Sequence, residues 1–250
     1  GGQEFLDAVQ ATLSRQGIRC PVMMVRGDGS VARAEFARER PVEIIHSGPA
    51  TSATGGRFLA GAENALVIDI GGTTTDLTLV EDGRVLAQEG GATVGPYRTC
   101  VRTIRARSFG LGGDSLIRFD HRQALSVGPE RVIPIARLCH FHPQVKDDLR
   151  GLLAEKKQIH YADELEYWML RREPDRPVTD EDTRQVIDLL RGGPRRLAHI
   201  RGQIGPIAPL CVSDLVNQEI VDRAGLTPTD LLHLTGEFAP WDAEAAALVA

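Results

Sequence analysis

The sequence feature that most constrains the fold is the stretch "ALVIDIGGTTTDLTLV", Ala65 to Val80. Two apolar runs enclose two glycines and three consecutive threonines, and Asp69 and Asp76 flank these small residues. Short apolar, β-branched runs separated by glycines are typical of two strands joined by a turn. We therefore expect a strand over Leu66 to Ile70, buried at the centre of a sheet, and a return strand over Thr75 to Val80.

The segments around this hairpin extend it into an α/β fold. A turn at Asp82-Gly83 leads into a third strand over Val85 to Ala87, which completes an antiparallel meander. Before the hairpin, "HSGPATSATGGRFLAGA" predicts a helix rich in small residues. Gly55 and Gly56 destabilise such a helix by about 1 kcal/mol each, so we expect a close approach to a sheet or a ligand there.

Other segments predict further strands in the first half of the chain. "PVEII" at 41–45 and "VRTIRARSF" at 101–109 have β-type patterns. The glycine pair Gly112-Gly113 follows, and a helix is expected to begin at Asp114 or Ser115.

The second half of the chain predicts mainly helices. "TDEDTRQVIDLLRGG" and "GPRRLAHIRGQIG" have helical start and stop signals, and "VSDLVNQEIVDRAGLTPTDLLHLTG" predicts two helices joined at "GLTPTD". Aromatic content favours a strand in "ELEYWMLRR". We therefore expect a sheet-rich domain over residues 1–130 and a mainly helical domain over 131–250.

Composition restricts the class of protein. The chain has 250 residues, of which 42% are hydrophobic and 25% charged, and this is ordinary globular composition. A net charge of −5 argues against a nucleic-acid partner. The apolar runs are too short to span a bilayer, no secretory leader opens the chain, and the four cysteines form no CxxC. We expect a cytoplasmic protein with reduced thiols and no membrane partner.

The glycines and threonines of the hairpin suit a phosphate group. Phosphate binding by backbone requires inward N–H groups, no Cβ in the way and nearby hydroxyl donors. Gly71 and Gly72 leave that space, and Thr73, Thr74 and Thr75 supply hydroxyls. An ordinary hairpin would use the same residues, because threonine also favours strands.

Two further features bear on an anion site. A carboxylate repels phosphate unless a cation lies between them. A Mg²⁺ ion held mostly through waters would therefore allow Asp69 and Asp76 to lie beside the anion. Asp76 could instead hydrogen-bond the backbone of the loop. The expected helix after Gly112 and Gly113 would direct its positive end toward the same anion.

Three segments follow one another along the chain: the small-residue helix "GPATSATGGRFLAG", the hairpin "LVIDIGGTTTDLTLV" and the glycine pair in "LGGDS". In this order they resemble the second phosphate motif of the actin, sugar-kinase and heat-shock-chaperone ATPase superfamily. Within it, the chain is most similar to the hydantoinase A and 5-oxoprolinase family, whose hallmarks resemble "PVMMVRGDGS", "RPVEIIHSGPA", "DIGGTTTD" and "GLTPTDLLHLTG". The similarity runs from Pro21 to Gly236. Two departures stand out, because "GLGGDS" replaces the "GAGGGS" of many members, and neither the first phosphate motif nor the adenosine segment is found. We expect a fragment that covers one lobe of the nucleotide cleft.

The resemblance implies an actin-like, ribonuclease H-like ATPase lobe of α/β class with a helical subdomain. It implies an enzyme that uses ATP and Mg²⁺ or Mn²⁺ to phosphorylate a carbonyl or enolate oxygen and so open a cyclic amide. The alternatives are a ketone carboxylase subunit and a non-catalytic nucleotide-binding scaffold. A hydantoinase B-type partner subunit and a cyclic amide or ketone substrate follow from the same resemblance. The residues that carry these roles are Asp69 and Asp76 as catalytic carboxylates, with Asp69 also on the metal, and Gly71, Gly72, Thr73, Thr74, Thr75, Gly112, Gly113 and Asp114 on the nucleotide.

Two other patterns suggest different chemistry. "CHFH" contains Cys139, His140 and His142, which could be zinc ligands, although their near adjacency suits one tetrahedral metal poorly. The alternative is a loop before a helix. The later arginine-rich helices resemble a helix-turn-helix nucleic-acid binder, and the alternative is a small helical bundle packed on the ATPase lobe.

Overall fold

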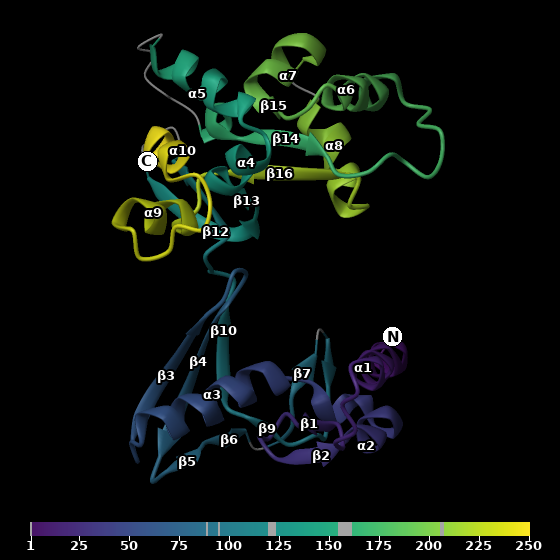
Figure 1. The fold of residues 1–250 in the computed structure, drawn as a ribbon, viewed down its shortest axis with the longest axis vertical. Helices are drawn as coiled ribbons and strands as arrows, with labels where there is room; N and C mark the ends of the chain where they lie inside the picture. Colours follow the sequence, from purple (N-terminus) through teal and green to yellow (C-terminus); the bar gives the residue numbers. More distant parts are fainter. Residues whose placement is uncertain (1, 89, 95, 120–123, 155–161, 206–207) are drawn as a thin grey trace. The chain divides into compact units, whose positions relative to one another are not determined.

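The computed structural model describes residues 2–88, 90–94, 96–119, 124–154, 162–205 and 208–250. Helices and mixed sheets confirm the α/β class (Figure 1). The chain forms two compact units: the first comprises residues 1–70 and 74–109, and the second comprises 71–73 and 110–250. This division falls earlier than the expected one at residue 130. The assignment of residues 1–130 to an ATPase lobe stays a prediction.

The first unit combines helices with short strands. Its helices are α1 (Gly2–Arg15), α2 (Ala34–Glu39), the 3-10 helix η1 (Pro41–Ile44) and α3 (Ser47–Ala60). Its strands are β1 (Met23–Val25), β2 (Val31–Arg33), β3 (Ala65–Ile70), β4 (Thr75–Glu81), β5 (Arg84–Val85), β6 (Ala87–Gln88), β7 (Thr93–Val94), β8 (Tyr97–Arg98), β9 (Thr103–Ile104) and β10 (Ala106–Phe109).

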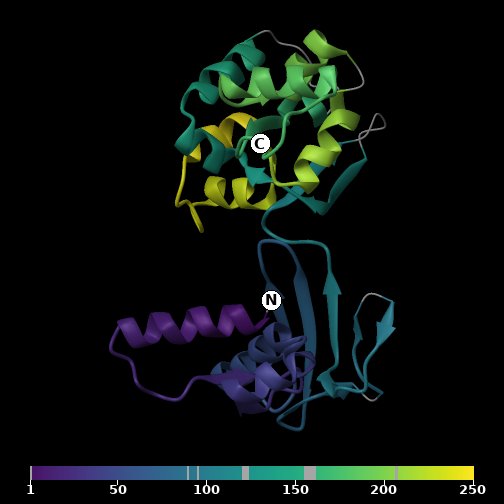
Figure 2. The ribbon, with the colours of Figure 1, turned by 90° about the vertical axis from the view of Figure 1, so that its right-hand side faces the viewer.

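The main sheet of this unit is built on the predicted hairpin. Its order is β10-β4-β3, and β5 also pairs with β4, so the predicted antiparallel meander is confirmed. Helix α3 packs on one face, and Figure 2 shows the helices of this unit on one side of these strands. A Cβ at Gly56 would lie 2.9 Å from Cγ1 of Val67, so Gly56 permits the close helix-to-sheet approach that the sequence predicted.

Two predictions for this unit are wrong. Within the described residues β3 is an edge strand, and Leu66, Ile68 and Ile70 are 55%, 54% and 70% exposed. The apolar run therefore alternates between a half-buried face toward α3 and an open face, instead of being buried on both. "PVEII" forms η1 instead of a strand, because Pro41 sits in its first turn, a position that a helix tolerates.

The second unit contains most of the helices. They are α4 (Ile135–Phe141), α5 (Gln144–Ala154), η2 (Ala162–Leu165), α6 (Glu181–Arg191), α7 (Leu197–Ile204), α8 (Ala208–Asn217), α9 (Pro228–Thr235) and α10 (Ala243–Val249). Its strands are β11 (Ser115–Phe119), β12 (Leu125–Arg131), β13 (Ile133–Pro134), β14 (Tyr167–Leu170), β15 (Arg195–Arg196) and β16 (Val221–Gly225).

A four-stranded sheet, β13-β16-β14-β15, forms the centre of this unit. Successive strand residues point to opposite faces, so Tyr167 enters a core with α4, α5 and α10, whereas Trp168 enters a core with α6, α7 and α8. Strands β11 and β12 form a separate hairpin. The second unit is therefore helix-rich, and its helices cover a sheet of which the sequence predicted only β14, in "ELEYWMLRR".

Two segments of this unit that the sequence predicted as helix are strands. The segment after Gly112-Gly113 is β11 and not a helix, and Val221–Gly225, expected within a helix, is β16. Strand β16 pairs with both β13 and β14, and these long-range pairings outweigh local helix propensity. In the described residues, no helix combines the length and the apolar composition needed to cross a membrane.

Candidate functional site

The two candidate carboxylates face each other in the β3–β4 hairpin. Asp69 and Asp76 are directly opposite in the antiparallel register, so their side chains share one face of the sheet. Ser52 on α3 donates a hydrogen bond from its hydroxyl to Asp69, and Ser108 on β10 does the same to Asp76. The structure thus pairs both predicted aspartates and adds a hydroxyl donor to each.

Sequence reasoning missed these two serines. Ser52 lies four residues before Gly56, and residues at this spacing share one helix face, so the small-residue pattern of α3 contained a signal for it. Ser108 could not be found in this way, because its contact depends on the pairing of β10 with β4.

The glycine loop of the hairpin is held by the second glycine pair. The backbone N–H of Gly113 donates to Gly71 O at 2.9 Å, and that of Asp114 donates to Gly72 O at 2.8 Å. A Cβ at Gly112 would lie 2.6 Å from Gly71 O, which leaves no room for any other residue. These contacts all lie within the second unit, and they bring together the two glycine pairs that the sequence singled out separately.

The backbone N–H groups of the glycine loop are available to a ligand. Gly71, Gly72 and Thr73 are exposed, and among the described residues their backbone N–H groups donate no hydrogen bond. Successive exposed N–H groups without a Cβ barrier form a concavity suited to an anion. The expected contribution from a helix N-terminus is absent here, because Gly112 and Gly113 lead into β11. Instead, Ser115 Oγ accepts a hydrogen bond from Gly112 N at 2.8 Å and closes a tight turn.

Asp114 has a specific partner that the sequence did not reveal. Its carboxylate accepts hydrogen bonds from Nε and Nη2 of Arg131, at 3.1 and 3.0 Å. A Cβ at Gly72 would lie 3.1 Å from Asp114 Oδ2, so the carboxylate lies beside the loop. Because Arg131 offsets its negative charge, Asp114 can lie near an anion at a smaller electrostatic cost than an isolated carboxylate would have.

The "GLTPTD" segment supports the glycine turn. Thr229 donates from both its backbone N–H and its hydroxyl to Gly113 O, at 2.9 and 2.8 Å. Thr227 and Asp230 form a capping box at the start of α9. The buried Asp230 carboxylate also accepts from the backbone N–H of Ala136 at 2.8 Å, and this bond ties α9 to the start of α4. The segment therefore holds the second glycine pair in place.

The zinc pattern does not form a metal site. Cys139 lies on α4 and is fully buried in the core, whereas His140 is exposed, because consecutive helical residues point in different directions. Burial raises the pKa of Cys139 to about 12, which keeps its thiol neutral near pH 7. In the parts of the chain that the structure describes, no group of three or more His, Cys, Asp or Glu side chains could hold a metal.

The helix-turn-helix interpretation is also wrong. Strands β15 and β16 interrupt the expected helices. The arginines do not form one exposed basic face: Arg191 pairs with Glu173 and Asp188, and Arg196 pairs with Asp148.

Comparison with known proteins places the N-terminal half of the chain in a family. The hydantoinase/oxoprolinase family matches residues 2–134, slightly more than half of the chain. The caprolactamase subunit alpha of Pseudomonas jessenii is 31% identical over 128 residues, which cover 50% of this chain and 18% of that protein. A nucleotide-free acetone carboxylase structure, from work on ATP-dependent acetone carboxylation, is 23% identical, with a TM-score of 0.43, and covers 50% of this chain and 18% of that one. The chain belongs to the hydantoinase/oxoprolinase family. It spans less than a fifth of the length of these two relatives, and its "GLTPTD" segment lies outside the region that the family matches.

Proposed function

We propose that the chain supplies phosphate-binding elements of an ATP-dependent enzyme of this family. The observation that carries the proposal is the backbone contact between Gly71-Gly72 and Gly113-Asp114, which fixes a loop with open N–H donors. A fixed array of such donors stabilises the charge on phosphate oxygens without having to reorganise. The hydroxyls of Thr73, Thr74 and Thr75 add donors along the same segment.

Asp69 and Asp76 fit a divalent cation. Mg²⁺ in phosphate sites is usually bound by one or two carboxylates, with waters and phosphate oxygens as its other ligands. Two carboxylates on one face, each also accepting a serine hydroxyl, match this donor set. In the proposal Asp69 holds the cation, and Asp76 supports it from the opposite strand. The cation would neutralise charge on the transferred phosphoryl group.

The proposed reaction is transfer of the γ-phosphoryl group of ATP to the carbonyl oxygen of a cyclic amide. ADP leaves, and water attacks the ring carbon that bears the phosphorylated oxygen. The ring C–N bond then breaks, the nitrogen takes up a proton, and inorganic phosphate is released from the new carboxylate. The relationship to caprolactamase subunit alpha supports a cyclic-amide substrate. Phosphorylation of a ketone enolate oxygen, ahead of carboxylation, is the second candidate. In both reactions the loop N–H groups position the phosphate.

A partner subunit is part of the proposal. The matched caprolactamase protein is named as an alpha subunit, which favours assembly of this chain with a hydantoinase B-type subunit. The glycine loop would supply phosphate contacts, while the partner would contribute to the second step of the reaction.

Binding of Mg²⁺–ATP to the chain tests the proposal directly. Gly112→Ala places a methyl group against Gly71 O and is expected to weaken binding at least tenfold, measured by equilibrium dialysis. Gly151→Ala on α5 is the matched control, because a Cβ there meets nothing within 4 Å. Absence of binding by the unaltered chain, or equal affinity of the two variants, would contradict the proposal.

A further inference from the structure

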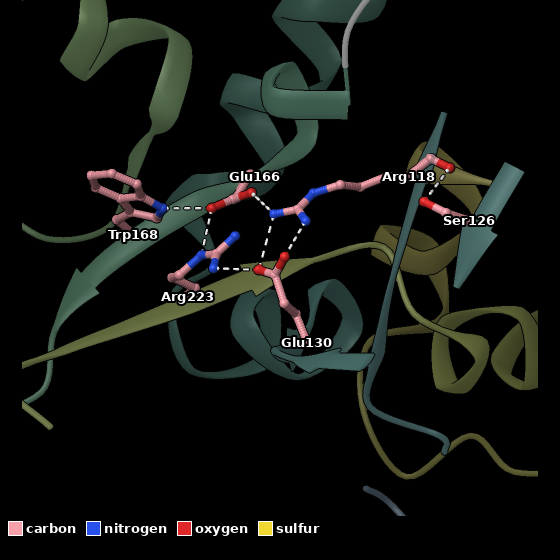
Figure 3. Close-up of polar contacts among 6 residues, drawn as sticks. All are labelled: Arg118, Ser126, Glu130, Glu166, Trp168 and Arg223. Atoms are coloured by element: carbon pink, nitrogen blue, oxygen red, sulfur yellow. Dashed lines mark hydrogen bonds and ion pairs between the residues drawn. The ribbon is translucent and has the colours of Figure 1, made fainter. Parts of the chain in front are cut away.

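One polar cluster of the second unit is a closed ring of four charged side chains (Figure 3). Arg118 donates to Glu130 Oε2 at 3.2 Å and to Glu166 Oε2 at 3.4 Å. Arg223 donates from Nε to Glu166 Oε1 and from Nη1 to Glu130 Oε2, at 2.7 and 2.6 Å. Two positive and two negative charges cancel within the ring. The ring therefore joins strands of the fold and does not indicate a ligand.

A second polar cluster, around His233 on α9, is connected to the proposed phosphate site. His233 is 3% exposed, and its Nδ1 lies 2.8 Å from Thr229 O. Its Nε2 accepts a hydrogen bond from the backbone N–H of Trp241 at 3.3 Å. Because Nε2 accepts, the proton of the neutral imidazole is on Nδ1, which donates to Thr229 O. Both ring nitrogens therefore have partners in this neutral form.

Thr229 continues this chain of hydrogen bonds to the glycine loop. Its backbone N–H and its hydroxyl both donate to Gly113 O, and the backbone N–H of Gly113 donates to Gly71 O. All of these residues belong to the second unit. The imidazole of His233 is therefore joined to the proposed phosphate loop through Thr229 and Gly113.

Aromatic contacts join the same imidazole to the segment between α9 and α10. The ring of Trp241 stacks on it, with 5.8 Å between the ring centroids and 14° between the planes. Phe238 meets it edge-on, with 6.2 Å between centroids. The guanidinium of Arg137 on α4 lies 5.6 Å from the centroid of the Trp241 ring. The position of Trp241 therefore depends on the imidazole.

A positive charge on His233 has no carboxylate partner among the described residues. The charged side chains of α9, of the elements that pack against it and of the segment after it have other partners or are exposed. The acidic ones are Asp230, which accepts from Thr227 and the backbone of α4, Asp242 and Glu244, which pair with Lys146 of α5, and the exposed Glu237. The others are Arg118 in the ring, Arg137 beside Trp241, and the exposed His140. Because a buried charge without a partner is costly, protonation favours an arrangement in which the imidazole reaches water.

We propose that His233 is a positioning residue for the phosphate loop, and that its protonation releases Trp241 and weakens phosphate binding. This inference rests on the proposed function of the loop. Protonated Nε2 is a donor and would face the N–H donor of Trp241, so their hydrogen bond is lost. When the imidazole moves toward water, Thr229 O also loses the bond from Nδ1. Since Thr229 holds Gly113, the loop is then less well fixed and binds phosphate less tightly.

The sign of the pH dependence follows from the protonation state. Imidazole side chains change charge between about pH 5 and pH 8. The arrangement that holds Thr229 and Trp241 contains the neutral imidazole, because Nε2 accepts a hydrogen bond. Phosphate binding is therefore expected to weaken as the pH falls through this range.

Tryptophan fluorescence without ligand tests the link from His233 to Trp241. The emission is expected to change in a single transition between about pH 8 and pH 5, because the surroundings of Trp241 change. The transition should disappear in His233→Gln, whose side chain does not titrate, and in Trp241→Phe, which retains Trp168. It should persist in His199→Gln, the matched control, because His199 is an exposed histidine of the same unit. No transition in the parent chain, or a transition that survives in His233→Gln, would overturn the inference.

Equilibrium dialysis with Mg²⁺–ATP tests the link from His233 to the phosphate loop. Between about pH 7.5 and pH 5.5, the affinity of the parent chain and of His199→Gln should fall about threefold more than that of His233→Gln. Protonation of ATP itself affects all three chains equally. By reciprocity, Mg²⁺–ATP should move the fluorescence transition of the parent chain to lower pH.

The two failures can be told apart. An equal pH dependence of affinity in the parent chain and His233→Gln, with no shift of the fluorescence transition, would overturn the inference and leave the proposed function intact. A parent chain that does not bind Mg²⁺–ATP even at the higher pH would overturn the proposed function, and the link from His233 to phosphate with it. Circular dichroism at each pH verifies that the chains remain folded.

Discussion

Asp69 and Asp76 lie opposite each other in the first unit, while Glu130 and Glu166 share an ion-pair ring in the second. The glutamates contact two guanidiniums, whereas each aspartate accepts a neutral serine hydroxyl. A hydroxyl orients a carboxylate but does not cancel its charge, and like charges directly opposite destabilise a sheet. The charges of the two glutamates are therefore balanced by arginines of the same chain. The charges of the two aspartates are not balanced by their serine partners, so this pair is suited to an added cation.

The largest expected effect comes from breaking the ring. Arg223→Met removes a partner from the buried Glu166 and is expected to lower the free energy of unfolding by about 3 kcal/mol, because a buried charge then lacks compensation. Urea denaturation measures this loss. Arg171→Met is the control, since Arg171 is half exposed and its ion pairs lie at the surface. Similar small losses in both variants would contradict the contrast between the two acidic pairs.

A smaller effect is expected from acid. The folded pKa of Glu130 is about 2, below its ordinary value of 4.5, so its stabilising contribution is fully present above pH 4.5 and is lost as the pH falls through 2. With allowance for its 44% exposed side chain, we expect about 1–2 kcal/mol over this window. Glu130→Gln should flatten the dependence of the unfolding free energy on pH in this range. An equally steep dependence in that variant would assign the loss to other carboxylates.

The smallest expected effect concerns the aspartate pair. Asp69→Asn retains the side-chain shape and removes one of two facing charges, so without metal the unfolding free energy should change by less than about 1 kcal/mol. Mg²⁺ should raise the thermal midpoint of the parent chain, since a ligand of the folded state stabilises it. This response should disappear in Asp69→Asn but persist in Glu81→Gln, an exposed control on the same strand β4. An identical Mg²⁺ response in Asp69→Asn would exclude Asp69 as a cation ligand.

The parts of the fold that depend on local pattern were predictable. The hairpin around Gly71 and Gly72 followed from two apolar runs and a glycine turn, and α6 followed from its start and stop signals. Its N-cap is Asp180, whose side chain accepts a hydrogen bond from the backbone N–H of Thr183. The close approach at Gly56 was also predictable, because a helix tolerates glycine poorly without such a reason.

The parts that depend on long-range pairing were not predictable. Strand β16 has a sequence compatible with a helix, and only its position between β13 and β14 makes it a strand. The contacts from Arg131 to Asp114 and from Thr229 to Gly113 join residues separated by 17 and 116 positions. Nothing in either local sequence indicates its partner.

By itself, the sequence determined the hairpin, the two glycine pairs and the acidic residues beside them, because turn chemistry and side-chain type are local properties. Only the tertiary structure decided that Gly112 lies against Gly71, that β3 is an edge strand of the described sheet, and that Arg118 and Arg223 surround Glu166. The physical reason is that these arrangements depend on which surfaces pack together, and packing brings together residues that are far apart in the chain.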